Sequence, residues 1–271
     1  MNKEDWITRH PYLRPIAEFE AQVEAAALGL PLAFAPVPDW QKHLNDFRAG
    51  VPLLYSSRPL IDLRPVATIM ESVTRKLAAS PLPAKLAQEI RDLEARLHDR
   101  PLDPERAVAW LVDDDAPGPR QSGMLRYIGW MVMARYLSRV VRQFDAWREE
   151  EDWLRSYCPT CGSPPAMAQL VGTDPGRRRF LSCGCCGTRW QYRRTGCPFC
   201  ENAEDHRLAV VMVEGEGGLR IDYCESCSGY LKTYDGVGSE ALLLADWTSI
   251  HLDIIARDRG LKRLAASLYE L

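Results

Sequence analysis

The sequence predicts an α+β protein: an all-helical N-terminal domain, then two tandem cysteine-based metal modules, then a C-terminal helix. Three observations predict this order. Residues 1–152 contain no cysteine and repeat their apolar residues with a helical period, all nine cysteines lie between Cys158 and Cys227, and the helical period returns near residue 240. The predicted boundaries are 1–152 for the helical domain, 153–194 and 195–235 for the two modules, and 236–271 for the C-terminal helix, which packs on the rest.

Apolar stripes and caps predict the helices of the N-terminal domain. Leu86, Ile90, Leu93 and Leu97 repeat at i, i+4, i+7 and i+11, which is typical of an amphipathic helix. Asp103 before Pro104 predicts a helix start, because a capping carboxylate followed by proline suits the first turn. Residues 123–153 are predicted to form one long helix. Its expected buried side is Leu125, Ile128, Val132, Val140, Phe144 and Trp147.

Short β-like runs separated by turns begin after Cys158. Residues 166–171 and 178–182 flank a Gly- and Pro-containing turn, and residues 208–213 and 219–223 flank a Gly-rich one, so each pair predicts a hairpin. The helical pattern returns near residue 240, and Gly260 is expected to end that helix. Leu244, Trp247, Ile250 and Ile254 are predicted to share one side of it.

Four CxxC pairs form an internal tandem repeat. The first unit carries the pairs Cys158/Cys161 and Cys183/Cys186, and the second carries Cys197/Cys200 and Cys224/Cys227. The offset between units is 39 residues at the first pair and 41 at the second. Each unit has the order knuckle, strand, turn, strand, knuckle, strand, which is that of a rubredoxin or zinc-ribbon module.

Two such knuckles on one hairpin predict a tetrahedral site with four thiolate ligands, which suits zinc or iron. If each unit is self-contained, the eight paired cysteines form two four-cysteine sites, one in each unit. A cross-braced pairing of first with third knuckle remains an alternative, although it explains the repeat less well. A complete four-sulfur shell leaves no position for substrate, so a structural role is favoured over catalysis. Iron in the same shell would add a redox-sensing or electron-transfer role.

Cys185 is left over from the four pairs. It is interpreted as a spectator thiol, with a ligand role in place of Cys183 or a reactive thiol as alternatives. The five histidines are scattered, and none shows ligand spacing with another: His10, His43, His98, His206 and His251.

Composition argues against several classes of function. The formal net charge is −3 and gives no basic footprint, so nucleic acid is not an expected partner. The first residues show no apolar signal segment, and no run of about 20 apolar residues could span a membrane. The expected location is therefore the cytoplasm.

The sequence resembles the formate dehydrogenase accessory proteins of the FdhE type. The likeness is carried by CPTCGSPP, RFLSCGCCGTRWQYRRTGCPFCEN and YCESCSGYLKTY, and by HPYLRPIAEFE in the helical region. A closing helix near residues 246–260 also fits, so the likeness spans nearly the whole chain. The family's knuckle cysteines correspond to the eight paired ones, whereas Cys185 departs from its pattern.

The resemblance implies a cytoplasmic, non-enzymatic maturation protein that binds the catalytic subunit of formate dehydrogenase before assembly or twin-arginine export. It also favours rubredoxin-type iron over zinc in the two sites. Self-association is possible. A thiol-redox or rubredoxin-like electron-transfer protein is the main alternative, and a nucleic-acid-binding ribbon is a weaker one.

Overall fold

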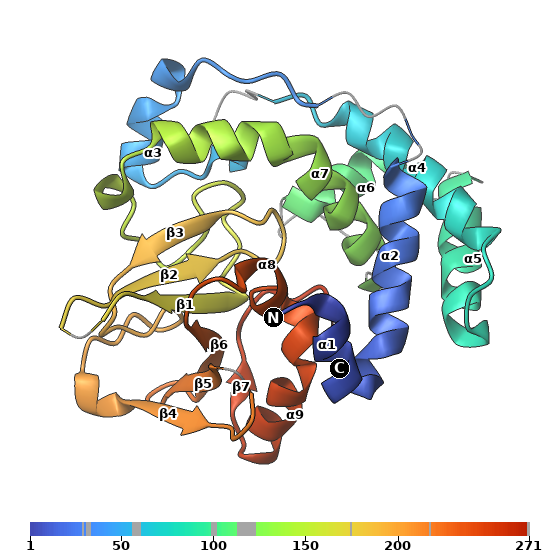
Figure 1. Cartoon of the computed structure of the whole chain (residues 1–271). Coiled ribbons are helices and arrows are strands. Elements are labelled where there is room, and N and C mark those ends of the chain that lie inside the picture. Colours follow the sequence, from blue (N-terminus) through green and yellow to red (C-terminus); the bar gives the residue numbers. More distant parts are fainter. Residues whose placement is uncertain are drawn as a thin grey trace.

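The computed structural model describes residues 1–28, 30, 34–55, 61–98, 102–112, 123–173, 175–216 and 218–269. It confirms the predicted fold class: a helical first part, a cysteine-bearing sheet and a closing helical segment (Figure 1). Within the described residues, no helix is both long enough and apolar enough to cross a bilayer.

The N-terminal part is helical, as predicted. Its helices are α1 (Lys3–Arg9), α2 (Arg14–Leu28), α3 (Leu44–Ala49), α4 (Arg64–Ala78), α5 (Ala84–His98), α6 (Pro104–Val112) and α7 (Gly123–Trp147), with 3-10 turns η1 (Pro11–Leu13), η2 (Trp40–Lys42), η3 (Leu53–Tyr55) and η4 (Glu150–Asp152). The stripe of α5 is buried at Ile90, Leu93 and Leu97. Asp103 caps α6, since its Oδ1 accepts the Glu105 N–H at 2.9 Å.

The two modules form one continuous sheet. The strands are β1 (Met167–Val171), β2 (Arg178–Ser182), β3 (Arg189–Tyr192), β4 (Leu208–Met212), β5 (Leu219–Cys224), β6 (Gly229–Asp235) and β7 (Lys262–Arg263). The order is β3-β2-β1-β6-β5-β4, with β7 beside β6. Each module supplies an antiparallel meander of three strands, and β1 joins β6 in parallel. Both predicted hairpins are present; Asp174 and Gly217, in their turns, lie outside the described residues.

Helix α7 ends at Trp147, six residues before the predicted end. Residues beyond it have partners that a continued helix could not reach. Trp153 is fully buried and stacks on Phe47 with ring centroids 5.1 Å apart. The Glu150 carboxylate accepts the Gln191 N–H of β3 at 2.9 Å. Leaving the helix therefore lets the chain cover the outer edge of the sheet, where an unpaired strand would otherwise be exposed.

The C-terminal segment is not the single helix that the sequence predicts. It divides into α8 (Glu240–Leu243), η6 (Asp246–Ser249) and α9 (Ile250–Asp258), and continues into β7. Ala245 is extended, with φ −77° and ψ 116°. Buried Lys232 donates to the carbonyl oxygens of Asp246 and Ser249 at 2.9 and 3.4 Å, so the chain bends to supply them. The predicted stripe fails at Ile254, which is 42 % exposed.

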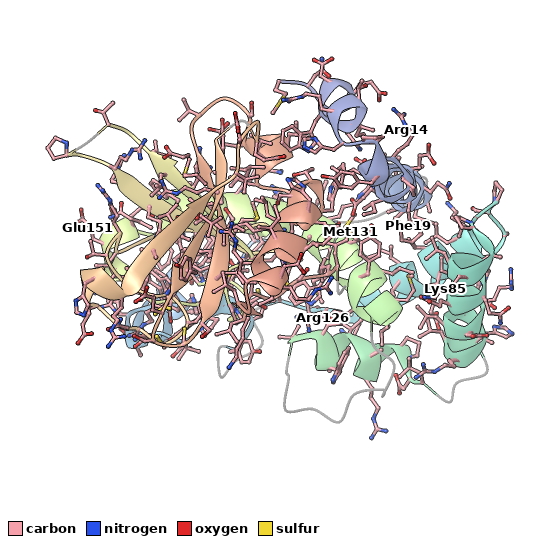
Figure 2. The ribbon with its side chains drawn as sticks, turned by 90° about the horizontal axis from the view of Figure 1, so that it is seen from below. Arg14, Phe19, Lys85, Arg126, Met131 and Glu151 are labelled. Atoms are coloured by element: carbon pink, nitrogen blue, oxygen red, sulfur yellow. The ribbon has the colours of Figure 1, made fainter. Side chains whose placement is uncertain are left out.

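Two apolar clusters position the modules. The larger one joins the helices to the first module and includes Phe47, Phe144, Trp153 and Trp190. At the periphery of this cluster, the ring of Phe19 in α2 stacks on that of Tyr127 in α7, with centroids 5.3 Å apart. In Figure 2, the labels Phe19, Arg126 and Lys85 mark helices α2, α7 and α5. The smaller cluster holds α1 and α9 against the second module. The first module therefore packs on the helical domain, and the second packs on α1 and α9.

Candidate metal centres

The first module turns its two knuckles toward one another. Cys158 and Cys161 precede β1, while Cys183 and Cys186 follow β2. Their side chains are all buried. The sulfurs of Cys158 and Cys186 are 3.5 Å apart, and those of Cys161 and Cys183 are 3.4 Å apart. Four sulfurs at about 2.3 Å from one ion would be about 3.8 Å apart in a tetrahedron, so the group fits one zinc or iron ion.

The second module repeats this arrangement. The sulfurs of Cys197 and Cys227 are 3.7 Å apart, and those of Cys200 and Cys224 are 3.8 Å apart. Equivalent cysteines of the two units therefore make equivalent contacts. The structure brings the eight cysteines together as two quartets, one in each module, and each could hold an ion. The cross-braced arrangement is not the one observed.

Cys185 lies outside the first quartet. Its backbone N–H donates to the Cys183 sulfur at 3.3 Å. Its own sulfur accepts from the Ser163 hydroxyl at 3.6 Å and lies 3.9 Å from the Arg126 guanidinium. Cys183 is thus the partner of Cys186 in the quartet, and Cys185 contributes a backbone hydrogen bond to it. Peptide N–H groups directed at sulfur favour the thiolate form that a metal requires.

In each quartet one cysteine has a lowered pKa, which favours its thiolate form, while other cysteines have raised pKa values. Burial alone would raise the pKa of Cys186, but hydrogen bonds from the neighbouring thiols and Thr188 lower it well below its usual value. Burial raises the pKa of Cys158 instead. In the second quartet, backbone N–H groups outweigh burial and lower the pKa of Cys224 to about 7, while burial raises that of Cys197 to about 12. Further thiolates therefore require a cation to offset their charge.

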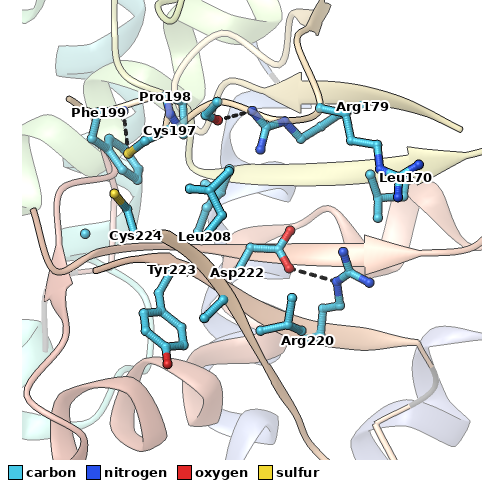
Figure 3. Close-up of a pocket in the computed structure, with 16 residues that line it drawn as sticks. Leu170, Arg179, Cys197, Pro198, Phe199, Leu208, Arg220, Asp222, Tyr223 and Cys224 are labelled. Carbon is cyan, nitrogen blue, oxygen red and sulfur yellow. Dashed lines mark hydrogen bonds and ion pairs between the residues drawn. The ribbon is translucent and has the colours of Figure 1, made fainter. Parts of the chain in front are cut away.

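The second quartet is more accessible than the first. Cys200 is exposed and Cys227 is partly exposed, whereas every sulfur-bearing residue of the first quartet is buried. A hollow of about 120 Å³ lies beside it (Figure 3). Cys197 and Cys224 lie at one end of this hollow, and the Arg220–Asp222 ion pair, with N–O distance 2.8 Å, lies toward the other. Solvent and small molecules can thus approach the second quartet.

This difference predicts two rates of metal release. A chelator added to the metal-loaded protein should remove one ion quickly and the other at least about tenfold more slowly, because the buried quartet is reached only after the core opens. Following the released metal with a chromogenic chelator measures both phases. Cys200→Ser should abolish the fast phase and keep the slow one. Release of both ions in a single phase would contradict the assignment of the fast phase to the second quartet and the slow phase to the first.

Each knuckle needs a residue with positive φ after its second cysteine. The first module uses glycine there, with φ 74° at Gly162 and 76° at Gly187. The second uses Glu201 at 58° and Ser228 at 59°, the non-glycine residues with positive φ among those described. Left-handed backbone is unfavourable for residues that carry a Cβ. The second module therefore stores strain at positions where the first has none.

Replacing Ser228 with glycine should stabilise the metal-loaded protein by about 0.5–1 kcal/mol, because it removes this strain. The reciprocal change Gly187→Ser should destabilise it by a similar amount. A Cβ at Gly187 would meet no atom within 4 Å, so the second variant reports backbone strain alone. Thermal unfolding of both variants measures the two shifts. Shifts of the same sign would refute the explanation.

The structure also gathers three residues that sequence reasoning missed. His10, Glu216 and His251 lie together with their ligand atoms within 4.8 Å of one another. The sequence separations from Glu216 are 206 and 35 residues, so no local spacing could reveal the group.

The fold and the quartets define a class of protein: a helical domain followed by tandem four-cysteine modules in one sheet. A sequence model of the FdhE central domain matches residues 157–194. An FdhE homologue from Aquifex aeolicus is 35% identical over 116 residues, covering 41% of each chain. One from Pseudomonas aeruginosa is 40% identical over 120 residues, covering 40% of this chain and 38% of that one. These matches span about two fifths of the curated relatives' length.

The likeness in structure is more extensive. The crystal structure of the FdhE protein from Pseudomonas aeruginosa aligns with a TM-score of 0.62 and 25% identity, covering 95% of this chain and 88% of that one. These findings confirm the resemblance predicted from the sequence motifs: the chain is similar in sequence and in fold to proteins of the FdhE type.

Proposed function

We propose that this chain is a non-enzymatic accessory protein that binds the catalytic subunit of formate dehydrogenase in the cytoplasm, before assembly or export. The observation that carries the proposal is the pair of four-sulfur quartets. An ion held by four sulfurs has a closed shell and no position for a substrate, so the quartets would hold the fold in place. The FdhE-type likeness supports the identity of the partner.

The ligands of the two ions are the eight paired cysteines, with iron favoured and zinc as the alternative. Sulfur separations of 3.4–3.8 Å and N–H groups directed at Cys183, Cys197 and Cys227 suit either metal. Elemental analysis of anaerobically purified protein should find two ions per chain. Ferric iron in sulfur sites absorbs visible light and zinc does not, so an absorption spectrum distinguishes them.

The partner is tested by affinity capture from cells that respire formate. Tagged protein should recover the catalytic subunit, identified by its mass, under gentle lysis; the same tag on an unrelated protein is the control. Purified catalytic subunit should then co-elute with the chain in gel filtration, whereas the mature assembled enzyme should not. Recovery of no catalytic subunit, or equal binding to the mature enzyme, would contradict the accessory role.

Electron transfer through the second quartet is the second candidate, because Cys200 is exposed there. An iron ion in that quartet would exchange one electron with a partner that contacts this side. Reversible one-electron reduction of the as-purified protein would favour this function. Zinc in both quartets would exclude it, and two tightly bound ions would also exclude a free dithiol oxidoreductase.

A further inference from the structure

A cluster of two histidines and one glutamate lies apart from both cysteine quartets. His10 ends α1, Glu216 belongs to the loop between β4 and β5, and His251 lies in the first turn of α9. The three side chains are only 10, 13 and 15 % exposed. The smaller apolar cluster brings together the segments that carry them. The group is therefore a product of the tertiary structure.

The two imidazoles converge on one carboxylate. His10 Nε2 is 3.2 Å from Glu216 Oε1, and His251 Nε2 is 2.8 Å from Glu216 Oε2. The rings stack with centroids 5.0 Å apart and an interplanar angle of 20°. Two donor atoms at about 2.1 Å from one ion lie about 3.0 Å apart when their bonds are perpendicular and about 3.4 Å apart in a tetrahedron, so these separations are close to those around a shared cation.

The hydrogen bond made by the other ring nitrogen of His10 supports the presence of a shared cation. Its Nδ1 is 3.0 Å from the Trp6 carbonyl oxygen, which can only accept, so Nδ1 carries the proton. In the neutral ring, Nε2 then directs a lone pair at a carboxylate oxygen. That contact is repulsive unless a cation lies between the two atoms or the ring gains a second proton. Metal-binding histidines characteristically donate their other N–H to a backbone carbonyl, as His10 does.

We propose that His10, Glu216 and His251 form a third metal site, for a divalent transition ion such as Zn²⁺ or Fe²⁺. Two nitrogens and a carboxylate oxygen are donors that these ions accept, in contrast to the all-sulfur quartets. Three protein ligands leave a position open for water or a small ligand, which a four-sulfur shell does not. The bound ion would also link α1 to the β4–β5 loop and α9. This inference is independent of the proposed accessory function.

The test counts zinc on the full-length protein with both quartets loaded. After equilibrium dialysis against buffered Zn²⁺, the wild-type chain should carry three ions. Glu216→Gln and His251→Ala should each carry two. His206→Ala is the matched control, because that side chain is 74 % exposed and lies outside the group of three, and it should retain three. Two ions on the wild-type chain would overturn the proposal and leave a hydrogen-bonded His–Glu–His group.

A spectroscopic measurement keeps the test independent of how well the variants fold. Adding Co²⁺ to wild-type protein whose two quartets hold zinc, and whose third site has been emptied, should give the weak visible bands of cobalt bound to nitrogen and oxygen. The intense near-ultraviolet band of cobalt bound to thiolate should be absent. Appearance of that thiolate band alone would mean that cobalt enters the cysteine quartets, and would overturn the third site.

Discussion

Cys158→Ser should abolish metal binding in the first quartet and unfold the first module, with a loss of stability larger than about 5 kcal/mol. Apparent binding free energies of structural zinc are about 10–16 kcal/mol, comparable to or larger than the roughly 5–15 kcal/mol that stabilises a typical domain. Cys158 is fully buried, and its quartet forms part of the larger apolar cluster. Losing the ion therefore leaves buried thiols in close contact without the metal–sulfur bonds that would join them.

The loss should extend into the helical domain. Backbone N–H groups of Leu53 and Leu54 donate to the carbonyl oxygens of Pro159 and Thr160, each at 2.9 Å, so the first knuckle is part of the joint between helices and sheet. Chemical denaturation followed by circular dichroism, with metal content measured in parallel, checks this. Cys185→Ser is the control and should keep both ions. A Cys158→Ser protein that lacks one ion but unfolds at the wild-type midpoint would refute the prediction.

Asp253→Ala should destabilise the protein by about 3–5 kcal/mol, because it breaks a buried charge network. Lys232 is fully buried, and its Nζ lies 2.8 Å from Asp253 Oδ2 and 2.7 Å from Asp246 Oδ1. Arg263 also contacts both carboxylates, and the Tyr230 hydroxyl donates to Asp253 at 2.7 Å. Without Asp253, the charges of Lys232 and Arg263 face the carboxylate of Asp246 alone. The free-energy cost of removing those charges from water is then no longer offset.

The matched control is Asp258→Ala, on the exposed side of the same helix. It removes the same carboxylate from α9 and should change the free energy of unfolding by less than about 0.5 kcal/mol. Urea denaturation of the two variants measures the difference. Equal effects would show that the loss comes from the helix and not from the buried network.

The same network predicts a loss of stability in acid. Burial would raise the pKa of Asp246, but the charges of Lys232 and Arg263 outweigh it and lower that pKa to about 2, from 3.8. Because the folded-state pKa lies below the unfolded one, the stabilisation is complete above the unfolded value and is lost as pH falls toward about 2. Denaturation midpoints of wild type and Asp246→Asn should therefore converge across this range. A difference between the two midpoints that stays the same across this pH range would contradict the lowered pKa of Asp246.

The sequence determined the features that depend on neighbours along the chain. Two cysteines separated by two residues meet at one point in a tight turn, so the CxxC spacing predicted the four knuckles. The tandem repeat favoured pairing within each unit over a cross-braced pairing, and the structure forms the two quartets of the first kind. The stripe of α5 and the cap at Asp103 were predicted for the same reason, since a helix brings residues i and i+4 to one side. The hairpins followed from apolar runs beside glycine-containing turns.

Only the tertiary structure decided which distant segments meet. The parallel pairing of β1 with β6 joins the modules into one sheet, and no local pattern specifies it. Buried Lys232 requires oxygen partners, so it breaks a segment whose apolar period predicted one helix. His10 and His251 converge on Glu216 because α1 and α9 pack on the same side of the second module. Periodicity and spacing report local geometry, whereas these contacts arise from burying apolar surface across the whole chain.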